Sequence, residues 1–171
     1  MSKQLPDGAR IRVATSAGEL DIEAIATLGM LGWSGQVDQA GVRQRARRLT
    51  RRLASVSDEG HHMVVVEAGG GLIGFGRIVR LDEPPTCWRL EGIVVHPDHR
   101  RQGVASAIVH RLVDCVRARR ATAVESQVHI DNAVSIAFHE RLGLANTGVF
   151  TDDEGDKLIR FRTLLDSEPP T

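Results

Sequence analysis

A basic segment that precedes a helical pattern is the part of this sequence best suited to chemistry. His96, His99, Arg100 and Arg101 gather in HPDHRRQG, directly before a helical pattern that begins at Val104. Cations at the N-terminal end of a helix cost about 0.3–1 kcal/mol each, because the helix dipole has its positive end there. An anion bound at this position would offset that cost.

The backbone of the same segment supplies hydrogen-bond donors for such an anion. The N–H groups of a first helical turn have no partner within the helix, so the amides of Gln102–Ser106 point outward. Gly103 lets a ligand approach the backbone closely, and Ala105 keeps the first turn narrow. These amides, with the guanidinium groups of Arg100 and Arg101, predict a cradle for a phosphate or pyrophosphate. The alternative is an exposed loop whose arginines extend into solvent.

The elements that must position this segment follow from hydrophobic periodicity. Apolar and β-branched runs predict strands at 10–14, 63–68, 72–81, 87–95 and 121–130, and a closing hairpin of 144–150 with 157–165. Helical spacing predicts helices at about 17–30, 39–55, 104–116 and 132–142. Ser16 and Glu19 have capping-box spacing for the first helix, and a glycine-rich break around Trp33 separates it from the second.

This order of elements predicts an α/β (α+β) fold in one domain. Hairpins come first and are followed by strands that alternate with helices. That order is typical of a single mixed, mostly antiparallel sheet of six or seven strands with helices on both faces. The chain has 171 residues, which is about the length of one domain. We expect a single domain over 1–171, with its core at about 10–165 and a tail at 166–171.

Composition and charge favour some classes of partner over others. The 22 Lys and Arg residues balance the 22 Asp and Glu residues, so no overall field attracts nucleic acid or an anionic membrane. We expect neither as a partner, although an arginine-rich helix at 42–55 leaves nucleic-acid binding as a weaker alternative. The polar start MSKQLPDGAR and the lack of a long apolar run are typical of a soluble cytoplasmic protein.

Two further patterns carry less weight. Gly69, Gly71 and Gly74 match the letters GxGxxG, but a strand pattern follows them instead of the helix that a dinucleotide site requires. We interpret these glycines as a hairpin turn. His96, Asp98 and His99 are residue types that bind zinc, but the loop indicates no fourth protein ligand, and we expect no metal.

Two segments of the chain resemble landmarks of a known family. His96–Ser106 is similar to the acyl-coenzyme A binding motif of the GNAT family of N-acetyltransferases, with Arg100, Gly103 and Ala105 at the positions R/Q-x-x-G-x-G/A. NAVSIAFHERLGL, residues 132–144, resembles the helix of the family that reads N-x-x-A-x-x-x-Y-E-K-x-G-F. The resemblance covers about residues 10–165, and the predicted order of elements is the order of the family.

The resemblance implies a site for acetyl-coenzyme A, which serves as the acyl donor. The pantetheine arm would lie between strands 87–95 and 122–128, against the backbone of Ile93–Val95. The pyrophosphate would bind the amides of Gln102–Ser106. Asn132 would face the pantetheine or the pyrophosphate, although as a helix cap it has an equally good structural explanation.

The resemblance also implies two proton-transfer roles, because the family moves an acetyl group directly from the thioester to an amine. Glu91 occupies the strand position where many members place a general base that acts directly or through a water molecule. The alternative is an ordinary strand residue that faces solvent or pairs with Arg77 or Arg89. His139 stands where the family usually has tyrosine, and the chain contains no tyrosine at all. Either His139 donates a proton to the thiolate, or it is an exposed helix residue and water donates.

In this family the acceptor enters over the first two helices and near the last hairpin. Here these segments carry Trp33 and an acidic turn with Asp152 and Asp153. The turn would attract a cationic amine, or it is simply a favourable turn sequence. The arginines of 42–55 recognise an acidic acceptor or a cofactor phosphate, or they form a solvated face.

The implied acceptor is a small-molecule amine or a peptide amine, and we expect a monomer or a homodimer. The alternative to an enzyme is a coenzyme A sensor or scaffold of the same fold that no longer transfers the acetyl group. The absence of tyrosine is the feature that keeps this alternative open.

Overall fold

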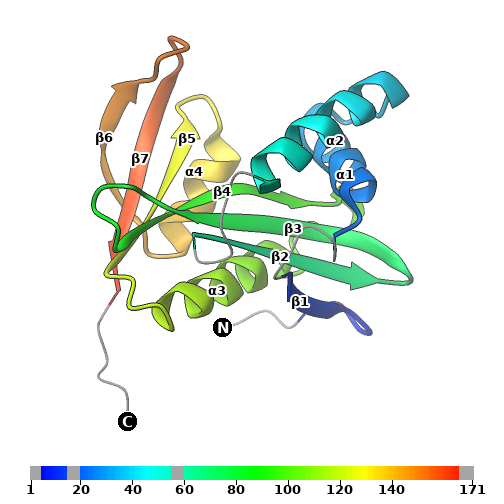
Figure 1. The fold of residues 1–171 in the computed structure, drawn as a ribbon, viewed down its shortest axis with the longest axis horizontal. Coiled ribbons are helices and arrows are strands. Elements are labelled where there is room, and N and C mark those ends of the chain that lie inside the picture. Colours follow the sequence, from blue (N-terminus) through cyan, green and yellow to red (C-terminus); the bar gives the residue numbers. More distant parts are fainter. Residues whose placement is uncertain (1–4, 15–19, 55–59, 166–171) are drawn as a thin grey trace. The chain divides into compact units, whose positions relative to one another are not determined.

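The computed structural model describes residues 5–14, 20–54 and 60–165 (Figure 1). Within them the strands are β1 (Arg10–Ala14), β2 (His61–Ala68), β3 (Gly71–Arg80), β4 (Cys87–Val95), β5 (Ala123–His129), β6 (Ala145–Thr151) and β7 (Lys157–Leu164). The α-helices are α1 (Ile22–Ser34), α2 (Gln39–Ala54), α3 (Val104–Arg117) and α4 (Ala133–Arg141), and η2 is a short 3-10 helix at Pro97–His99.

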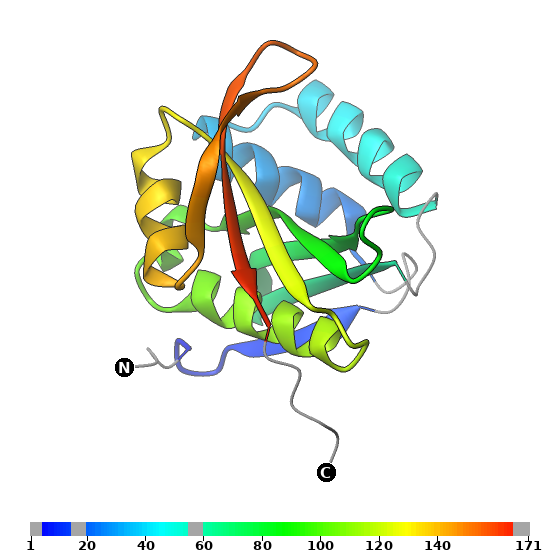
Figure 2. The same cartoon turned by 90° about the vertical axis from the view of Figure 1, so that its left-hand side faces the viewer.

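The described strands form one mixed sheet in the order β1-β2-β3-β4-β5-β7-β6. The pairs β1–β2, β5–β7 and β6–β7 are antiparallel, whereas β4 and β5 are parallel. The helix α3 connects the two parallel strands, as parallel neighbours require a long crossover. Strand β7 lies between β5 and β6 (Figure 2). The predicted mixed sheet with helices on both faces is confirmed, and it has seven described strands.

The chain divides into two compact units. The first contains the residues up to Ile78 and the segment Gly92–Leu112. The second contains Val79–Glu91 and the residues from Val113 onward. Strand β4 and helix α3 therefore each contribute residues to both units.

In the first unit, helices pack on both faces of β3. Phe75 lies in a buried cluster with Ile25 of α1. Successive residues of a strand point to opposite faces, so Gly74 and Gly76 face the other side. There a Cβ atom would lie 3.1 Å (Gly74) or 2.6 Å (Gly76) from Ile108 of α3. Glycine at both positions therefore allows α3 to pack closely on the sheet.

The second unit is built on the ladder between β5 and β7, which runs from Ala123–Leu164 to His129–Leu158. Helix α4 packs on this ladder through His139, whose ring stacks on Phe161 of β7 with the ring centroids 5.3 Å apart. Phe161 is fully buried. The aromatic contact fixes α4 to the middle of β7.

The first helix differs from its prediction at both ends. It begins at Ile22, because the side chain of Asp21 accepts a hydrogen bond from the backbone N–H of Ala24 and caps it. The predicted cap at 16–19 lies outside the described residues. The helix continues through Trp33 and ends at Gly35, whose positive φ of 70° closes the last turn. The break predicted around Trp33 is therefore wrong by two residues, because the pattern alone did not distinguish Gly32 within the helix from Gly35 at its end.

The glycines of the β2–β3 connection form a hairpin turn, as predicted. Gly69 and Gly70 both adopt positive φ values, of 59° and 79°. Gly74 is buried within β3 and belongs to no phosphate loop. Among the helices of the described ranges, none has the length and apolar character needed to cross a membrane.

Candidate functional site

The segment between β4 and α3 is held in place by its own backbone and by β3. The backbone N–H of His96 donates to the carbonyl oxygen of Ile73 in β3 at 2.8 Å. The turn of η2 then follows, and Nδ1 of His96 accepts from the N–H of Asp98 at 3.3 Å. The side chain of Gln102 donates to the carbonyl oxygen of Asp98 at 3.0 Å. These bonds define a compact loop directly before the first turn of α3.

The loop enters α3 through two residues with left-handed backbone conformations. Arg101 has a φ of 61° and Gly103 has a φ of 83°. Such a conformation is unusual for a residue with a side chain and favours glycine. A turn of this kind directs neighbouring backbone N–H groups to one side, where they form a concave site for an anion.

The first turn of α3 adds further donors to this site. Its first intrahelical bond runs from the N–H of Ala107 to the carbonyl oxygen of Gly103 at 2.9 Å. The N–H groups of Val104, Ala105 and Ser106 precede this bond and have no earlier turn to which they can donate. The predicted cradle therefore has the backbone that it requires, and the positive end of the α3 dipole lies at the same place.

Arg100 has a different position from the one predicted for it. Its Nη2 donates to the carbonyl oxygen of Gly32 at 2.9 Å, and its Nε lies 3.5 Å from the carbonyl oxygen of Val95. Its guanidinium thus binds the last turn of α1 and the end of β4. Arg101, by contrast, has an exposed side chain at the left-handed turn.

Strand β4 contains a residue whose role the sequence patterns did not indicate. Gly92 adopts a φ of 63° in the middle of the strand. The parallel ladder with β5 runs from Cys87–Ala123 to Leu90–Ser126 among the described residues, whereas β4 continues to Val95. A glycine in this conformation within a strand marks a bend or a bulge. The apolar run EGIVV contains this glycine, and that was the available signal.

In the first unit, α1 packs directly on the end of β4. A Cβ atom on Gly32 would lie 2.5 Å from Val94 Cγ1. Val94 is buried, and Ile93 and Val95 are half-buried. The backbone of Ile93–Val95, the loop and the start of α3 therefore belong to one compact unit.

The second unit holds the predicted general base. Glu91 is half-buried on β4. Two residues earlier, Arg89 forms an ion pair with Glu125 of β5, with Nε and Nη2 at 2.9 Å and 2.8 Å from Oε1. Glu125 is buried, so this ion pair satisfies its charge.

Helix α4 of the same unit positions Asn132 and His139. The side chain of Asn132 accepts from the N–H of Ser135 at 3.0 Å and caps the helix. Nδ1 of His139 lies 2.7 Å from the carbonyl oxygen of Ser135. A carbonyl oxygen only accepts, so Nδ1 carries the proton and Nε2 of the neutral ring carries a lone pair.

His139 is buried, with 5% of its surface exposed, so the alternative of an exposed helix residue was wrong. Its Nε2 has no hydrogen-bond partner among the described residues. Burial lowers the pKa of His139 below 6.5, and the hydrogen bond to the Ser135 carbonyl partly opposes this shift. The ring is therefore mostly neutral at neutral pH.

The residues predicted on the acceptor side lie in both units. Trp33 is 58% exposed, and the guanidinium of Arg45 lies 4.2 Å from the centre of its ring. Asp152 holds the β6–β7 turn, because its Oδ1 accepts from the N–H groups of Glu154 and Asp156. Asp153 is exposed in the same turn. Asp152 therefore has a structural role in this turn.

The segment around His96 does not form a cluster of metal ligands. His96 Nδ1 lies 3.8 Å from a carboxylate oxygen of Asp98. Within the described ranges, no group of three or more His, Cys, Asp or Glu side chains is placed to hold a metal ion.

A comparison with protein families matches residues 30–144 to the "Acetyltransferase (GNAT) family". This match begins in the last turns of α1 and runs past the end of α4, and it includes the loop before α3. The chain belongs to the GNAT family. The resemblance predicted from His96–Ser106 and residues 132–144 is thereby confirmed at the level of the family.

Curated relatives of this GNAT chain are acetyltransferases by name. It is 38% identical over 77 residues to aminoglycoside N(6')-acetyltransferase type 1 of Acinetobacter haemolyticus, covering 45% of this chain and 48% of that protein. It is 29% identical over 100 residues to N-alpha-acetyltransferase RimI of Mycobacterium tuberculosis (strain ATCC 25618 / H37Rv), covering 58% of this chain and 60% of that protein. The match to mycothiol acetyltransferase of Parafrankia sp. (strain EAN1pec) covers 28% of that protein. The chain therefore spans less than half the length of the mycothiol acetyltransferase and of the Acinetobacter haemolyticus enzyme.

Solved structures share the GNAT fold. A putative acetyltransferase of the GNAT family from Desulfovibrio desulfuricans superimposes with a TM-score of 0.72 at 18% identity, covering 91% of this chain and 98% of that chain. An aminoglycoside 6'-N-acetyltransferase complexed with coenzyme A gives a TM-score of 0.69 at 14% identity, covering 93% of this chain and 99% of that chain. At these identities the likeness concerns the fold.

Proposed function

We propose that this GNAT chain is an N-acetyltransferase that moves an acetyl group from acetyl-coenzyme A to a primary amine. Membership of the family supports the reaction class. The observation that carries the proposal is the backbone at the start of α3, where Arg101 and Gly103 turn into the left-handed region beside the amides of the first helical turn. This arrangement fits the pyrophosphate of coenzyme A.

We infer that the donor is held mainly by backbone groups. The amides of Gln102–Ser106 would bind the pyrophosphate, and Arg101 would add its charge from the exposed side of the loop. Arg100 would act by fixing this loop to α1, because its guanidinium is engaged with the carbonyl oxygens of Gly32 and Val95. The backbone of Ile93–Val95 would hold the pantetheine arm.

In the proposed reaction, the amine attacks the thioester carbonyl directly within a ternary complex. An alkylammonium ion with a pKa of about 10 must lose a proton before its nitrogen can attack. Glu91 is the proposed base, acting directly or through a water molecule. The new C–N bond forms as the C–S bond breaks, and the thiolate leaves with the electron pair of the C–S bond.

The proton that neutralises the thiolate comes from His139 or from water. Donation by His139 requires its imidazolium form, because Nδ1 is engaged with the Ser135 carbonyl and Nε2 of the neutral ring has no proton. Burial disfavours that form. A thiol ionises with a pKa of about 8.5, so the thiolate is a good leaving group without a dedicated acid. These observations favour water as the donor.

The acceptor is proposed only as a class. By name, the relatives are a mycothiol acetyltransferase, an aminoglycoside N(6')-acetyltransferase and an N-alpha-acetyltransferase. We propose a small-molecule amine or a peptide amine that enters past Trp33, Asp152 or Asp153. We further propose a cytoplasmic monomer or homodimer.

A second candidate function is a coenzyme A sensor that no longer transfers the acetyl group. The observation in its favour is the buried His139 at the position where the family usually has tyrosine. The two functions share the cradle but differ in turnover. Release of free thiol from acetyl-coenzyme A with a panel of amines separates them. Amine-dependent release supports the transferase, whereas tight coenzyme A binding without release for any amine supports the sensor.

A further inference from the structure

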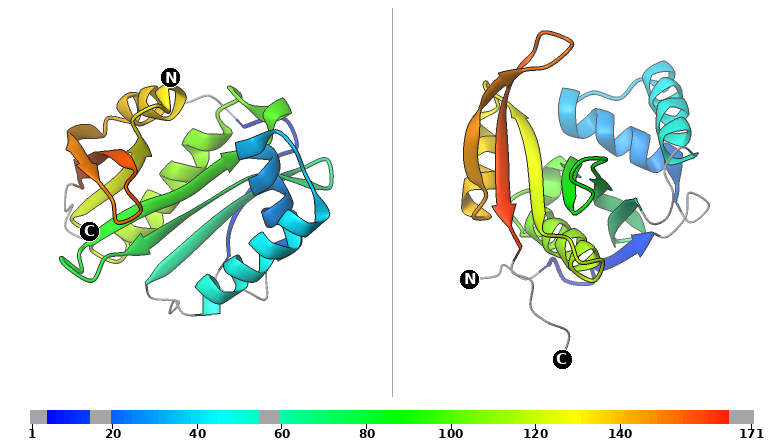
Figure 3. Two further views of the ribbon diagram at one scale, coloured as in Figure 1. Left: turned by 90° about the horizontal axis from the view of Figure 1, so that it is seen from above. Right: turned by 60° about the vertical axis from the view of Figure 1, so that its left-hand side comes forward.

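Helix α2 has two chemically different faces. One face packs on α1 (Figure 3): Val42 is buried, and a Cβ atom on Gly41 would lie 2.5 Å from Met30 of α1. The other face is exposed and carries Arg43, Arg47, Arg48 and Arg51, which we call the arginine stripe. The stripe follows from helical spacing, because these positions lie opposite the buried one.

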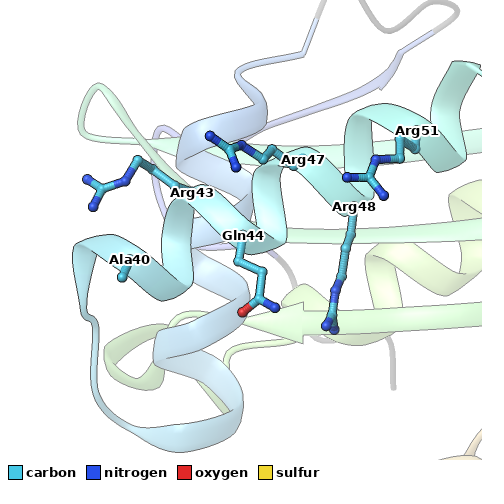
Figure 4. A pocket seen from close by; sticks show the side chains of 6 residues that line it. All are labelled: Ala40, Arg43, Gln44, Arg47, Arg48 and Arg51. Carbon is cyan, nitrogen blue, oxygen red and sulfur yellow. The ribbon is translucent and has the colours of Figure 1, made fainter.

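The arginine stripe borders a hollow of about 390 Å³ on the surface of α2 (Figure 4). Its lining residues are Ala40, Arg43, Gln44, Arg47, Arg48 and Arg51. In Figure 4 the side chains of Gln44 and Arg48 extend to one side of the helix, and those of Arg47 and Arg51 lie on the other. Long polar side chains therefore line the hollow together with the small Ala40.

Among the described residues, no acidic side chain pairs with the stripe. The sequence of α2 contains no acidic residue. In the part of the chain that the structure describes, no ion pair includes any of the four arginines. Burial, and then the charge of Arg48, lower the pKa of the neighbouring Arg45. An anion at this face would relieve the repulsion.

The stripe also has a regular pitch. Arg43, Arg47 and Arg51 are four residues apart, which corresponds to about 6 Å along the helix axis. Carboxylates on alternate residues of an extended peptide are about 6.7 Å apart. Guanidinium groups bind carboxylates as planar forks, so an extended acidic peptide would meet successive arginines with successive carboxylates.

Helix α2 is linked to the loop that precedes α3 within the same unit. The guanidinium of Arg45 lies over the ring of Trp33 at 4.2 Å. The preceding residue, Gly32, accepts the hydrogen bond from Arg100 of that loop. The arginine stripe is therefore on the helix next to the one that anchors the proposed donor site.

We propose that the arginine stripe binds an acidic segment of a polypeptide that carries the acceptor amine. This inference rests on the proposed function, because it names the class of acceptor. It selects an acidic peptide over nucleic acid, since the six lining residues include no aromatic side chain on which a base could stack. It also predicts that a polycationic amine is a poor acceptor, because the stripe repels it.

Direct binding tests the stripe without turnover. The probe is a peptide of alternating Ala and Glu with a free N-terminus and a C-terminal fluorophore, and fluorescence anisotropy reports its affinity. Matched peptides carry Gln or Lys in place of Glu. We expect the Glu peptide to bind at least about tenfold more tightly than the Gln peptide at low salt, and high salt to remove this difference. The Lys peptide should not bind.

Variants assign the binding to α2. Arg47→Glu with Arg51→Glu should weaken the Glu peptide by about tenfold or more. The control is Arg111→Glu with Arg141→Glu, which changes the net charge equally at exposed positions of α3 and α4. The control should keep its affinity within about twofold. Arg47→Lys with Arg51→Lys should keep part of the affinity, because lysine retains the positive charge but lacks the planar guanidinium that binds a carboxylate with two hydrogen bonds.

Acetyl transfer to the same three peptides separates the two proposals. The stripe variant should raise KM for the Glu peptide and leave kcat unchanged, with no effect on the Gln peptide. Equal transfer to all three peptides would overturn the stripe as an acceptor site and would leave the transferase intact. If the Glu peptide binds through the stripe but no amine causes thiol release from acetyl-coenzyme A, the transferase proposal is refuted. The proposal that the stripe binds an acidic peptide then still stands.

Three outcomes would overturn the proposal that the arginine stripe binds an acidic peptide. The first is equal affinity for the Glu and Gln peptides. The second is an equal loss of affinity in the stripe variant and in its control. The third is displacement of the Glu peptide by a single-stranded RNA oligonucleotide that binds more tightly and loses affinity in the stripe variant, because this would identify the stripe as a nucleic-acid site.

Discussion

Arg100 donates from Nη2 to the carbonyl oxygen of Gly32 across 2.9 Å, and this bond joins the loop before α3 to the last turn of α1. The last carbonyl groups of a helix have no partner within it, and the dipole makes that end negative. A guanidinium at this position therefore satisfies an orphan acceptor and a negative helix end together. The cost of a positive charge near the N-terminal end of α3 is therefore offset by the bond of Arg100 to the C-terminal end of α1.

We expect Arg100→Ala to loosen this loop. Loss of the bond should lower the free energy of unfolding by about 1 kcal/mol, since the group is charged but exposed to solvent. It should also weaken coenzyme A binding, because the amides of the loop lose their fixed orientation. Urea unfolding and calorimetric titration measure the two effects. Arg111→Ala, an exposed arginine of α3, is the control and should change neither value.

Gly103 and Gly70 form a matched pair for testing the cradle. Their φ values are 83° and 79°, so Ala should cost about 1–2 kcal/mol of stability at either position. Gly70 lies in the β2–β3 turn. Only Gly103→Ala should also weaken coenzyme A binding, measured by calorimetric titration. Equal coenzyme A affinity of the two variants would refute the cradle.

The elements of the fold could be predicted from the sequence more fully than the partners of individual side chains. Helix starts, strand runs and glycine turns are local, so α3 and the hairpin turn at Gly69 were predictable. Arg100 binds a carbonyl that is 68 residues away in the sequence. No local pattern contains such a contact. The anion site at the amides and Arg101 stays a prediction, whereas Arg100 has a partner within the fold that the local sequence did not indicate.

His139 illustrates the same limit on α4. Its helix has little amphipathic contrast between faces, so the sequence did not indicate which side of α4 is buried. The decisive contact is with Phe161, which β7 brings next to the helix. Gly92 was missed for a different reason. It lies within an apolar run that reads as an uninterrupted strand, although its φ is positive.

We expect Glu91→Gln to reduce kcat/KM by about 10²–10⁴-fold, because the acceptor amine would lack its base. The affinity for coenzyme A should not change, which distinguishes a base from a residue of the cradle. Steady-state thiol release and calorimetric titration measure the two quantities. Glu140→Gln, on the exposed side of α4, is the control and should keep full activity. Full activity of Glu91→Gln would exclude Glu91 as the base.

His61 should make the fold less stable in acid. Burial, followed by the charges of Arg77 and His62, lowers the pKa of His61 from 6.5 to about 4. The unfolded chain therefore binds a proton at this position that the folded chain does not bind between these values, so stability falls as pH decreases from 6.5 toward 4. His61→Gln should show a smaller fall in Tm over this range. His110→Gln, at an exposed position of α3, should behave as the unaltered protein does.

His139→Phe distinguishes the two proton donors. The lowered pKa of His139 leaves little imidazolium at neutral pH, so kcat should stay within about twofold if water protonates the thiolate. A dedicated acid would instead be worth about 10²–10⁴-fold, and its loss would also remove the alkaline decline of kcat that deprotonation of His139 produces. The same variant has a stability readout. Because the folded pKa lies below the unfolded value of 6.5, the native protein loses stability as pH falls below 6.5, and the Phe variant should lose less. A large fall in kcat with the predicted stability change would assign the donor role to His139.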